Sequence, residues 1–128
     1  MSSAEDGFRR LTIGEPALIA AVASHEGRPL DVRPLDALTE ALLQIGVLIA
    51  LDAPPSSYRA AVEAAQRAGA RLEELLAVLV AVAGTVGSAR IISAAPRIAL
   101  AAGYDVEAEL ELIGPAGQKA QPSPLASG

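Results

Sequence analysis

The segment that most constrains the fold covers residues 42–79, where two strongly apolar stretches are separated by a turn that contains Pro54 and Pro55. Before the turn, apolar residues recur at three- and four-residue steps, which is the period of an α-helix. Beyond Ala41, the only strongly polar residue of that helix is Gln44, so its second half is expected to be buried on nearly all sides. The segment therefore predicts core helices joined by this turn.

The residue types available for the core also favour helices. Hydrophobic residues make up 52% of the 128 residues, but only one Phe, two Tyr and no Trp are among them. A core built from Ala, Leu, Val and Ile favours closely packed helices over a sheet sandwich. A chain of this length forms one domain with one core, and it is too small to hide this much apolar surface alone. We therefore expect an all-α, single-domain protein that forms a homo-oligomer.

Charge and cysteine content exclude several classes of function. The net charge is −5, and the ten Lys and Arg residues form no basic block, which argues against nucleic acid or an anionic membrane as the main partner. The absence of cysteine removes disulfides, thiol catalysis and thiolate metal sites. The single histidine, His25, cannot supply a tetrahedral zinc set and is interpreted as a surface residue. We expect no metal and no cofactor.

The sequence also predicts a cytoplasmic protein without a membrane span. The N-terminus is acidic before any apolar run, which is not the pattern of a signal peptide. The apolar runs over residues 41–51 and 75–86 are shorter than the roughly 18 to 20 residues that a spanning helix needs. A longer run over residues 75–102 is interrupted by Arg90 and Arg97.

Helix signals divide the chain into three parts. We expect a polar N-terminal arm over residues 1–14, a helical domain over residues 15–104, and a C-terminal extension over residues 105–128 with a flexible tail from Gly114. About five helices are expected, over residues 16–25, 35–51, 57–68, 72–83 and 88–102. Residues 106–113 alternate partly at a period of two, so a short strand and a frayed helix both remain open.

Caps and helix breakers set the expected boundaries. Ser56 is expected to cap the helix after the turn, and Ser88 the last helix of the domain. Gly84 is expected to end the preceding helix, and Pro96 to kink or split the last one. Gly46 costs about 1 kcal/mol relative to alanine inside a helix, and we attribute it to close helix packing.

Four motifs follow one another through the helical domain. They are Glu15-Pro16-Ala17-Leu18, Leu35-Asp36-Ala37-Leu38-Thr39-Glu40-Ala41-Leu42, Tyr58-Arg59-Ala60-Ala61, and Ala68-Gly69-Ala70-Arg71-Leu72-Glu73-Glu74-Leu75. In this order and spacing they resemble the carboxymuconolactone decarboxylase-like proteins, a family that includes the alkylhydroperoxidase D type, over residues 15–104. The resemblance implies an all-α bundle that assembles as a trimer or hexamer through its apolar helices.

The resemblance does not extend to the redox chemistry of that family. Redox members carry Cys-x-x-Cys at the turn, a histidine shortly after it and a glutamate in the preceding helix. These positions fall here on Ala53 or Pro54, Ser56 or Ser57, Ala60 or Ala61, and Ala41 or Leu42. Because the chain has no cysteine, thiol peroxidase activity is excluded.

A decarboxylase branch of the family needs no cysteine, only groups that bind a carboxylate and move a proton. The residues considered for these roles are Tyr58, Arg59 and Glu40 as catalytic groups and Ser56, Ser57 and Arg90 as ligand contacts. Arg59 could clamp a carboxylate and Tyr58 could donate a proton. Alternatively, Arg59 is a solvated helix residue and Tyr58 fills the core. Arg90 and Arg97 could hold an anion, but salt bridges to a neighbouring subunit's glutamate are favoured.

These observations leave several hypotheses for the function. The first is a redox-inactive homo-oligomer of this family that binds a small ligand or has a structural role. The second is a cofactor-free decarboxylase-type enzyme that acts on a small carboxylated substrate. A pocket with an arginine and an acid or tyrosine would favour the enzyme, whereas a turn packed solid would favour the scaffold. A third is a partner module whose tail, residues 118–128, docks elsewhere.

Overall fold

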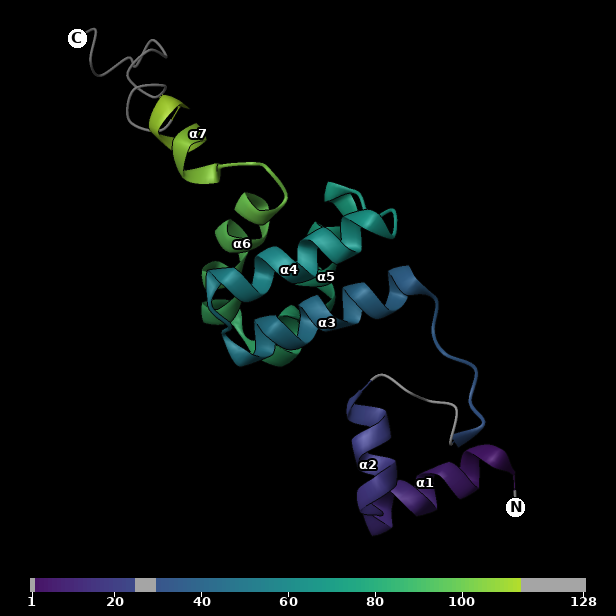
Figure 1. Cartoon of the computed structure of the whole chain (residues 1–128). Helices are drawn as coiled ribbons and strands as arrows, with labels where there is room; N and C mark the ends of the chain where they lie inside the picture. The colour runs from purple at the N-terminus through teal and green to yellow at the C-terminus, as the bar shows by residue number, and fades with distance from the viewer. Residues whose placement is uncertain (1, 25–29, 114–128) are drawn as a thin grey trace, which may run out of the picture. The chain divides into compact units, whose positions relative to one another are not determined.

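The computed structural model describes residues 2–24 and 30–113 (Figure 1). These residues form helices and no strand: α1 (Ser3–Ile13), α2 (Pro16–Ala23), α3 (Ala37–Leu51), α4 (Pro55–Arg67), α5 (Leu72–Val86), α6 (Ser88–Ala101) and α7 (Val106–Ile113). The all-α prediction is confirmed for the described residues, and the alternative left open for residues 106–113 resolves to a helix. His25 and the predicted tail from Gly114 lie outside the described residues.

The chain divides into two compact units, Met1–Asp36 and Ala37–Gly128. The sequence instead suggested a boundary after residue 14. The first unit contains α1 and α2, which contact each other, so the segment expected to be an arm belongs to a small helical hairpin. Leu18 of α2 is buried.

Helix α1 lies in the segment that was predicted as a polar arm, and its start carries a complete capping box. The Ser2 hydroxyl accepts a hydrogen bond from the Glu5 backbone N–H at 3.1 Å, and the Glu5 carboxylate accepts one from the Ser2 N–H at 3.3 Å. This reciprocal pair satisfies two of the backbone donors that a helix start leaves unpaired. Gly14 then ends the helix in the left-handed conformation, with φ of 75°.

The second unit is a bundle of four helices, α3 to α6, extended by α7 (Figure 1). Helix α3 contacts α4 and α5, and α6 contacts the same two helices from the other side, which closes the ring. Residues without accessible surface come from α3 and α4 and converge at the centre of the bundle: Ile45, Ile49, Tyr58, Val62 and Ala65. Leu75 of α5 and Ile98 of α6 complete this core at 1% and 2% exposure. Ile45 and Ile49 thus lie in the core as the helical period predicts. The expectation that the second half of α3 is buried on nearly all sides is wrong for the single chain, because Leu43, Val47 and Leu51 are 55%, 56% and 69% exposed.

Two expectations for this bundle are wrong: the end of a helix at Gly84 and a split of the last helix at Pro96. Helix α5 continues through Gly84 to Val86, because Val82 and Val86 extend the stripe that packs on the core and this packing outweighs the low helix propensity of glycine. Helix α6 runs through Pro96 without a break. Pro96 lacks an N–H, so the carbonyl of Ile92 loses its helical donor, but the helix keeps its contacts to α4 and α5.

The serine caps are also wrong. The N-cap of α4 is Pro54, with Pro55 as the first helical residue, and Ser56 lies inside the first turn. Proline favours the first helical position because its φ is already helical and its missing N–H would be unpaired there. This signal places the start of α4 before the serine pair. In α6 the N-cap is Gly87, so Ser88 is the first residue of the helix.

Candidate functional site

The turn between α3 and α4 is tied to α6 by a compact set of polar contacts. The Arg97 Nη1 donates a hydrogen bond of 2.8 Å to the Ala53 carbonyl and lies 3.5 Å from the Asp52 Oδ1. The same Asp52 oxygen accepts a hydrogen bond of 3.0 Å from the Ser93 hydroxyl. One carboxylate at the turn therefore fixes two side chains that are one helical turn apart on α6.

The backbone places Asp52 at a position where glycine is the usual residue. Asp52 donates from its N–H to the Ile49 carbonyl at 3.1 Å, and Ala53 donates to the Leu48 carbonyl at 3.0 Å. This is the Schellman pattern of a helix C-terminus, in which one residue adopts the left-handed conformation. Asp52 does so with φ of 51°, although a side chain makes that conformation costly.

The other two helices that end in this way use glycine at the same position. Gly69 ends α4 with φ of 99°, and Gly103 ends α6 with φ of 96°. The Asp52 side chain therefore stays in a strained position at the turn, and its visible role there is to hold Arg97 and Ser93.

The remaining edge of the Arg97 guanidinium is open. Both of its contacts at the turn use Nη1, and neither Nε nor Nη2 donates a hydrogen bond to a residue that the structure describes. An Nε–Nη2 edge is one of the two faces on which arginine binds a carboxylate with two parallel hydrogen bonds. The turn thus orients Arg97 and leaves a two-donor edge for a ligand.

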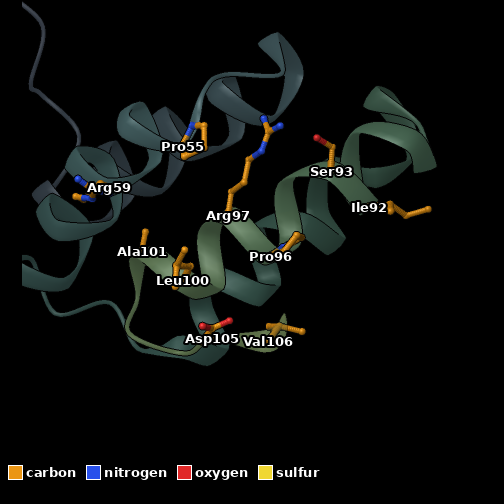
Figure 2. A pocket seen from close by; sticks show the side chains of 10 residues that line it. All are labelled: Pro55, Arg59, Ile92, Ser93, Pro96, Arg97, Leu100, Ala101, Asp105 and Val106. Atoms are coloured by element: carbon orange, nitrogen blue, oxygen red, sulfur yellow. The ribbon is translucent and has the colours of Figure 1, made fainter. Parts of the chain in front are cut away.

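A pocket of about 650 Å³ is lined in part by Arg97 (Figure 2). Its apolar wall consists of Pro55, Ile92, Pro96, Leu100, Ala101 and Val106. Its polar residues are Arg59 from α4, Ser93 and Arg97 from α6, and Asp105 from the start of α7. The volume and the mixture of apolar wall and few polar groups are typical of small-molecule sites.

Arg59 is the second cation of the pocket. It is exposed, and within residues 2–24 and 30–113 it makes no ion pair. The predicted carboxylate clamp therefore lies at the pocket. Arg97 carries the better-oriented guanidinium, since the Asp52 carboxylate and the Ala53 carbonyl hold it.

Tyr58 lies beneath the turn and does not line the pocket. Its side chain is fully buried, and its hydroxyl has no hydrogen-bond partner among the described residues. Burial raises the pKa of the Tyr58 phenol above its ordinary value of 10.0, nearby Arg97 lowers this pKa, and Asp52 raises it. Tyr58 is therefore an uncharged core residue at neutral pH, close to the charges of Arg97 and Asp52.

The other predicted site residues lie away from the pocket. Glu40 is in the first turn of α3, roughly 16 Å along the helix from Leu51 at 1.5 Å per residue. Ser56 and Ser57 are in the first turn of α4, and Arg90 is exposed on α6. None of these four residues lines the pocket. Of the predicted set, the structure brings only Arg59 to the pocket, with Tyr58 beneath the adjoining turn.

The structure adds Asp52, Ser93 and Asp105 to the site and gives Arg97 a different partner. A salt bridge from Arg97 to a neighbouring subunit was favoured, whereas Arg97 pairs with Asp52 of its own chain. The sequence signal for Asp52 was its place directly after the apolar helix, where glycine is expected. Nothing in the sequence pairs Ser93 with Asp52, which lies 41 positions earlier.

A second concave surface of about 500 Å³ lies between α3 and α5. We call it the apolar groove, and its lining is Thr39, Leu42, Leu43, Gly46, Val47, Ala50, Val78, Ala81, Val82, Thr85 and Val86. Among the described residues of this lining, only the two threonines are polar. Leu43 and Val47 at its rim are 55% and 56% exposed. The groove therefore leaves apolar side chains of the bundle open to water.

Within the described part of the chain, no group of three or more His, Cys, Asp or Glu residues could hold a metal ion. Over the same residues, no helix is long and apolar enough to cross a membrane. Comparison with protein-family models, with curated proteins and with solved structures finds no match to this chain.

Proposed function

We propose that this chain is a redox-inactive, homo-oligomeric protein of the carboxymuconolactone decarboxylase-like type that binds a small carboxylated ligand in the pocket between α4 and α6. The observation that carries the proposal is that Arg97 lines a pocket with an apolar wall and keeps its Nε and Nη2 donors without a hydrogen bond to the described residues. A carboxylate accepts two parallel hydrogen bonds from such an edge, and charge-assisted bonds of this kind are about twice as strong as neutral ones.

The rest of the pocket indicates the size and polarity of the ligand. One side of α6 offers an apolar surface to a hydrocarbon chain through Pro96, Leu100 and Ala101. Arg59 adds positive charge to the pocket. The Asp52 contact reduces the net charge at Arg97 but fixes its orientation, so less conformational entropy is lost when a ligand binds. A short aliphatic carboxylate is the simplest molecule with these properties.

Self-association is supported by the apolar surface of α3 and α5. Leu43 and Val47 are exposed at the groove, and Leu76 and Val80 of α5 are 61% and 72% exposed. Exposed apolar patches, such as the rim of this groove, mark association surfaces on proteins. The resemblance implies a trimer or a hexamer, with the apolar helices at the subunit interfaces.

The binding proposal is tested by calorimetric titration of hexanoate into the wild-type protein and into two arginine variants. We expect R97Q to weaken hexanoate binding by about tenfold or more, because a charge-assisted bidentate contact is lost. R90Q is the matched control, since Arg90 lies on the same helix but outside the pocket, and we expect it to bind as the wild type does.

Equal losses in R97Q and R90Q would contradict the proposal, because they would point to a general effect of charge. Absence of hexanoate binding by the wild type would contradict it as well. Thermal unfolding of each variant separates lost binding from lost folding, since R97Q also removes the contacts to the turn.

A cofactor-free decarboxylase is the second candidate, and the Tyr58 hydroxyl is the observation that favours it. This hydroxyl has no partner among the described residues and lies close enough to Arg97 for the two to interact electrostatically. In such a reaction the bond between the carboxylate carbon and its neighbour breaks, carbon dioxide leaves, and the electron pair left on carbon takes a proton from the Tyr58 hydroxyl, which regains one from water. Because Tyr58 is buried and does not line the pocket, this candidate requires the turn to open during the reaction. Release of carbon dioxide by the wild type and its loss in Y58F, with binding retained, would support this candidate.

A further inference from the structure

Charges of opposite sign lie on two sides of the pocket (Figure 2). Arg97 extends from α6 toward the α3–α4 turn near Pro55, whereas Asp105 lies at the far end of α6, next to Val106. Pro96 and Leu100 lie between the two charged groups. A ligand with a single anionic group can use only one end of this pocket, because the two ends favour opposite charges.

The Asp105 carboxylate is held in place by the end of α6. The Tyr104 N–H donates to the Ala99 carbonyl at 2.8 Å, and the Gly103 N–H donates to the Leu100 carbonyl at 3.0 Å. With Gly103 left-handed, these bonds fix the chain that leads into Asp105. Asp105 therefore has a defined position relative to the apolar wall on α6.

One Asp105 oxygen remains available to a ligand. Oδ1 accepts a hydrogen bond of 3.0 Å from the Ala108 N–H, which caps α7. Oδ2 has no hydrogen-bond or ion-pair partner among the residues that the structure describes. Among the described residues that line the pocket, Asp105 is the only acid.

We propose that the pocket selects a zwitterion: a molecule with a carboxylate at one end, a primary ammonium at the other, and a short hydrocarbon chain between them. The carboxylate binds the Nε–Nη2 edge of Arg97, the chain packs on Pro96 and Leu100, and the ammonium donates to Asp105. This inference rests on the proposed function, since it assigns the other end of the same ligand. A dicarboxylate is disfavoured, because its second carboxylate would face Asp105.

The experiment compares 6-aminohexanoate, hexanoate and adipate by calorimetric titration with wild-type protein and with D105N. Asparagine caps a helix as well as aspartate does, so D105N removes the charge and keeps the start of α7. We expect the wild type to bind 6-aminohexanoate about three- to tenfold more tightly than hexanoate, and adipate more weakly than hexanoate. In D105N the preference for the amino acid should disappear, and hexanoate should bind at least as tightly as it does to the wild type, because a negative charge is removed from the pocket.

The optimum chain length is a second readout. Among 4-aminobutyrate, 6-aminohexanoate and 8-aminooctanoate, one length should bind most tightly, because Arg97 and Asp105 have a fixed separation. In the matching unsubstituted carboxylates, affinity should only increase with chain length.

The titrations distinguish an error in the zwitterion assignment from an error in the proposed function. If hexanoate and 6-aminohexanoate bind equally, or if D105N weakens both to the same degree, the zwitterion assignment is wrong and carboxylate binding stands. If none of the carboxylates binds the wild type, both are wrong.

Discussion

At the scale of single residues, Asp52 shows how one side chain can cost backbone energy and still organise a site. It takes the left-handed position at the end of α3, which Gly69 and Gly103 take in α4 and α6. Its carboxylate is the contact that holds both Ser93 and Arg97. The site therefore depends on an aspartate where the backbone alone would favour glycine.

Replacement of Asp52 separates the backbone cost of its left-handed conformation from the contribution of its carboxylate contacts. D52A and D52G both lose the carboxylate, but only alanine keeps a side chain in the left-handed position. We expect D52G to be more stable than D52A by about 1 kcal/mol in urea unfolding. Both variants should bind hexanoate more weakly, since Arg97 loses its orientation. Equal stability of the two variants would show that the position is not strained.

Tyr58 gives a prediction of pH dependence. Its pKa is raised in the folded protein by burial, so the folded state keeps the phenol proton to higher pH than the unfolded state does. The unfolded state loses this proton first, and the free energy of unfolding therefore falls as pH rises above 10.0, the ordinary value. Y58F should remove the decrease in the free energy of unfolding that Tyr58 causes at alkaline pH, measured by urea unfolding at pH 8 to about 11.

The exposed tyrosine provides the control for that experiment. Tyr104 is 44% exposed, and Y104F should leave the alkaline loss of stability in place. At neutral pH, Y58F should be as stable as the wild type or up to about 1 kcal/mol more stable, because the Tyr58 hydroxyl is buried without a partner. A large destabilisation by Y58F at neutral pH would show that the hydroxyl makes a contact in solution.

At the scale of elements, the helices that the sequence predicts well are those with a continuous apolar stripe. Helices α3, α4 and α5 carry such stripes, and their residues form the core. Helix α1 was missed because its signal is a capping box, in Ser2 and Glu5, within a segment of polar composition. The contacts of the site were not predictable, because the Arg97–Ala53 bond joins residues 44 positions apart. Short-range periodicity carries no information on such pairs.

The interpretation that close helix packing requires Gly46 can be tested by substitution. Close helix packing was expected to require it, but a methyl group at Gly46 would meet Val82 Cγ1 at 3.5 Å, which is an ordinary contact. We expect G46A to stabilise the isolated bundle by about 0.5 to 1 kcal/mol, through helix propensity alone. G84A in α5 is the matched control, since its methyl group would meet nothing within 4 Å. A smaller gain in G46A than in G84A would indicate that another surface occupies the apolar groove.

At the scale of the whole molecule, the apolar groove predicts self-association. A lysine at Val47 would place a charge at the rim of the groove, so V47K should reduce the molecular mass measured by sedimentation equilibrium to that of a smaller species. A60K is the control, because Ala60 is exposed on α4 and lies outside the groove. A monomeric wild type, or equal effects of V47K and A60K, would contradict self-association through the groove.

The central claim, that the pocket between α4 and α6 binds a small carboxylate, is tested most directly by an amide chemical-shift titration with 6-aminohexanoate. We expect saturating shifts that concentrate at the pocket, at Ser93, Arg97 and Asp105, with little change at the apolar groove. Shifts that concentrate at Gly46 and Val47, or no saturable shift at the pocket, would contradict it.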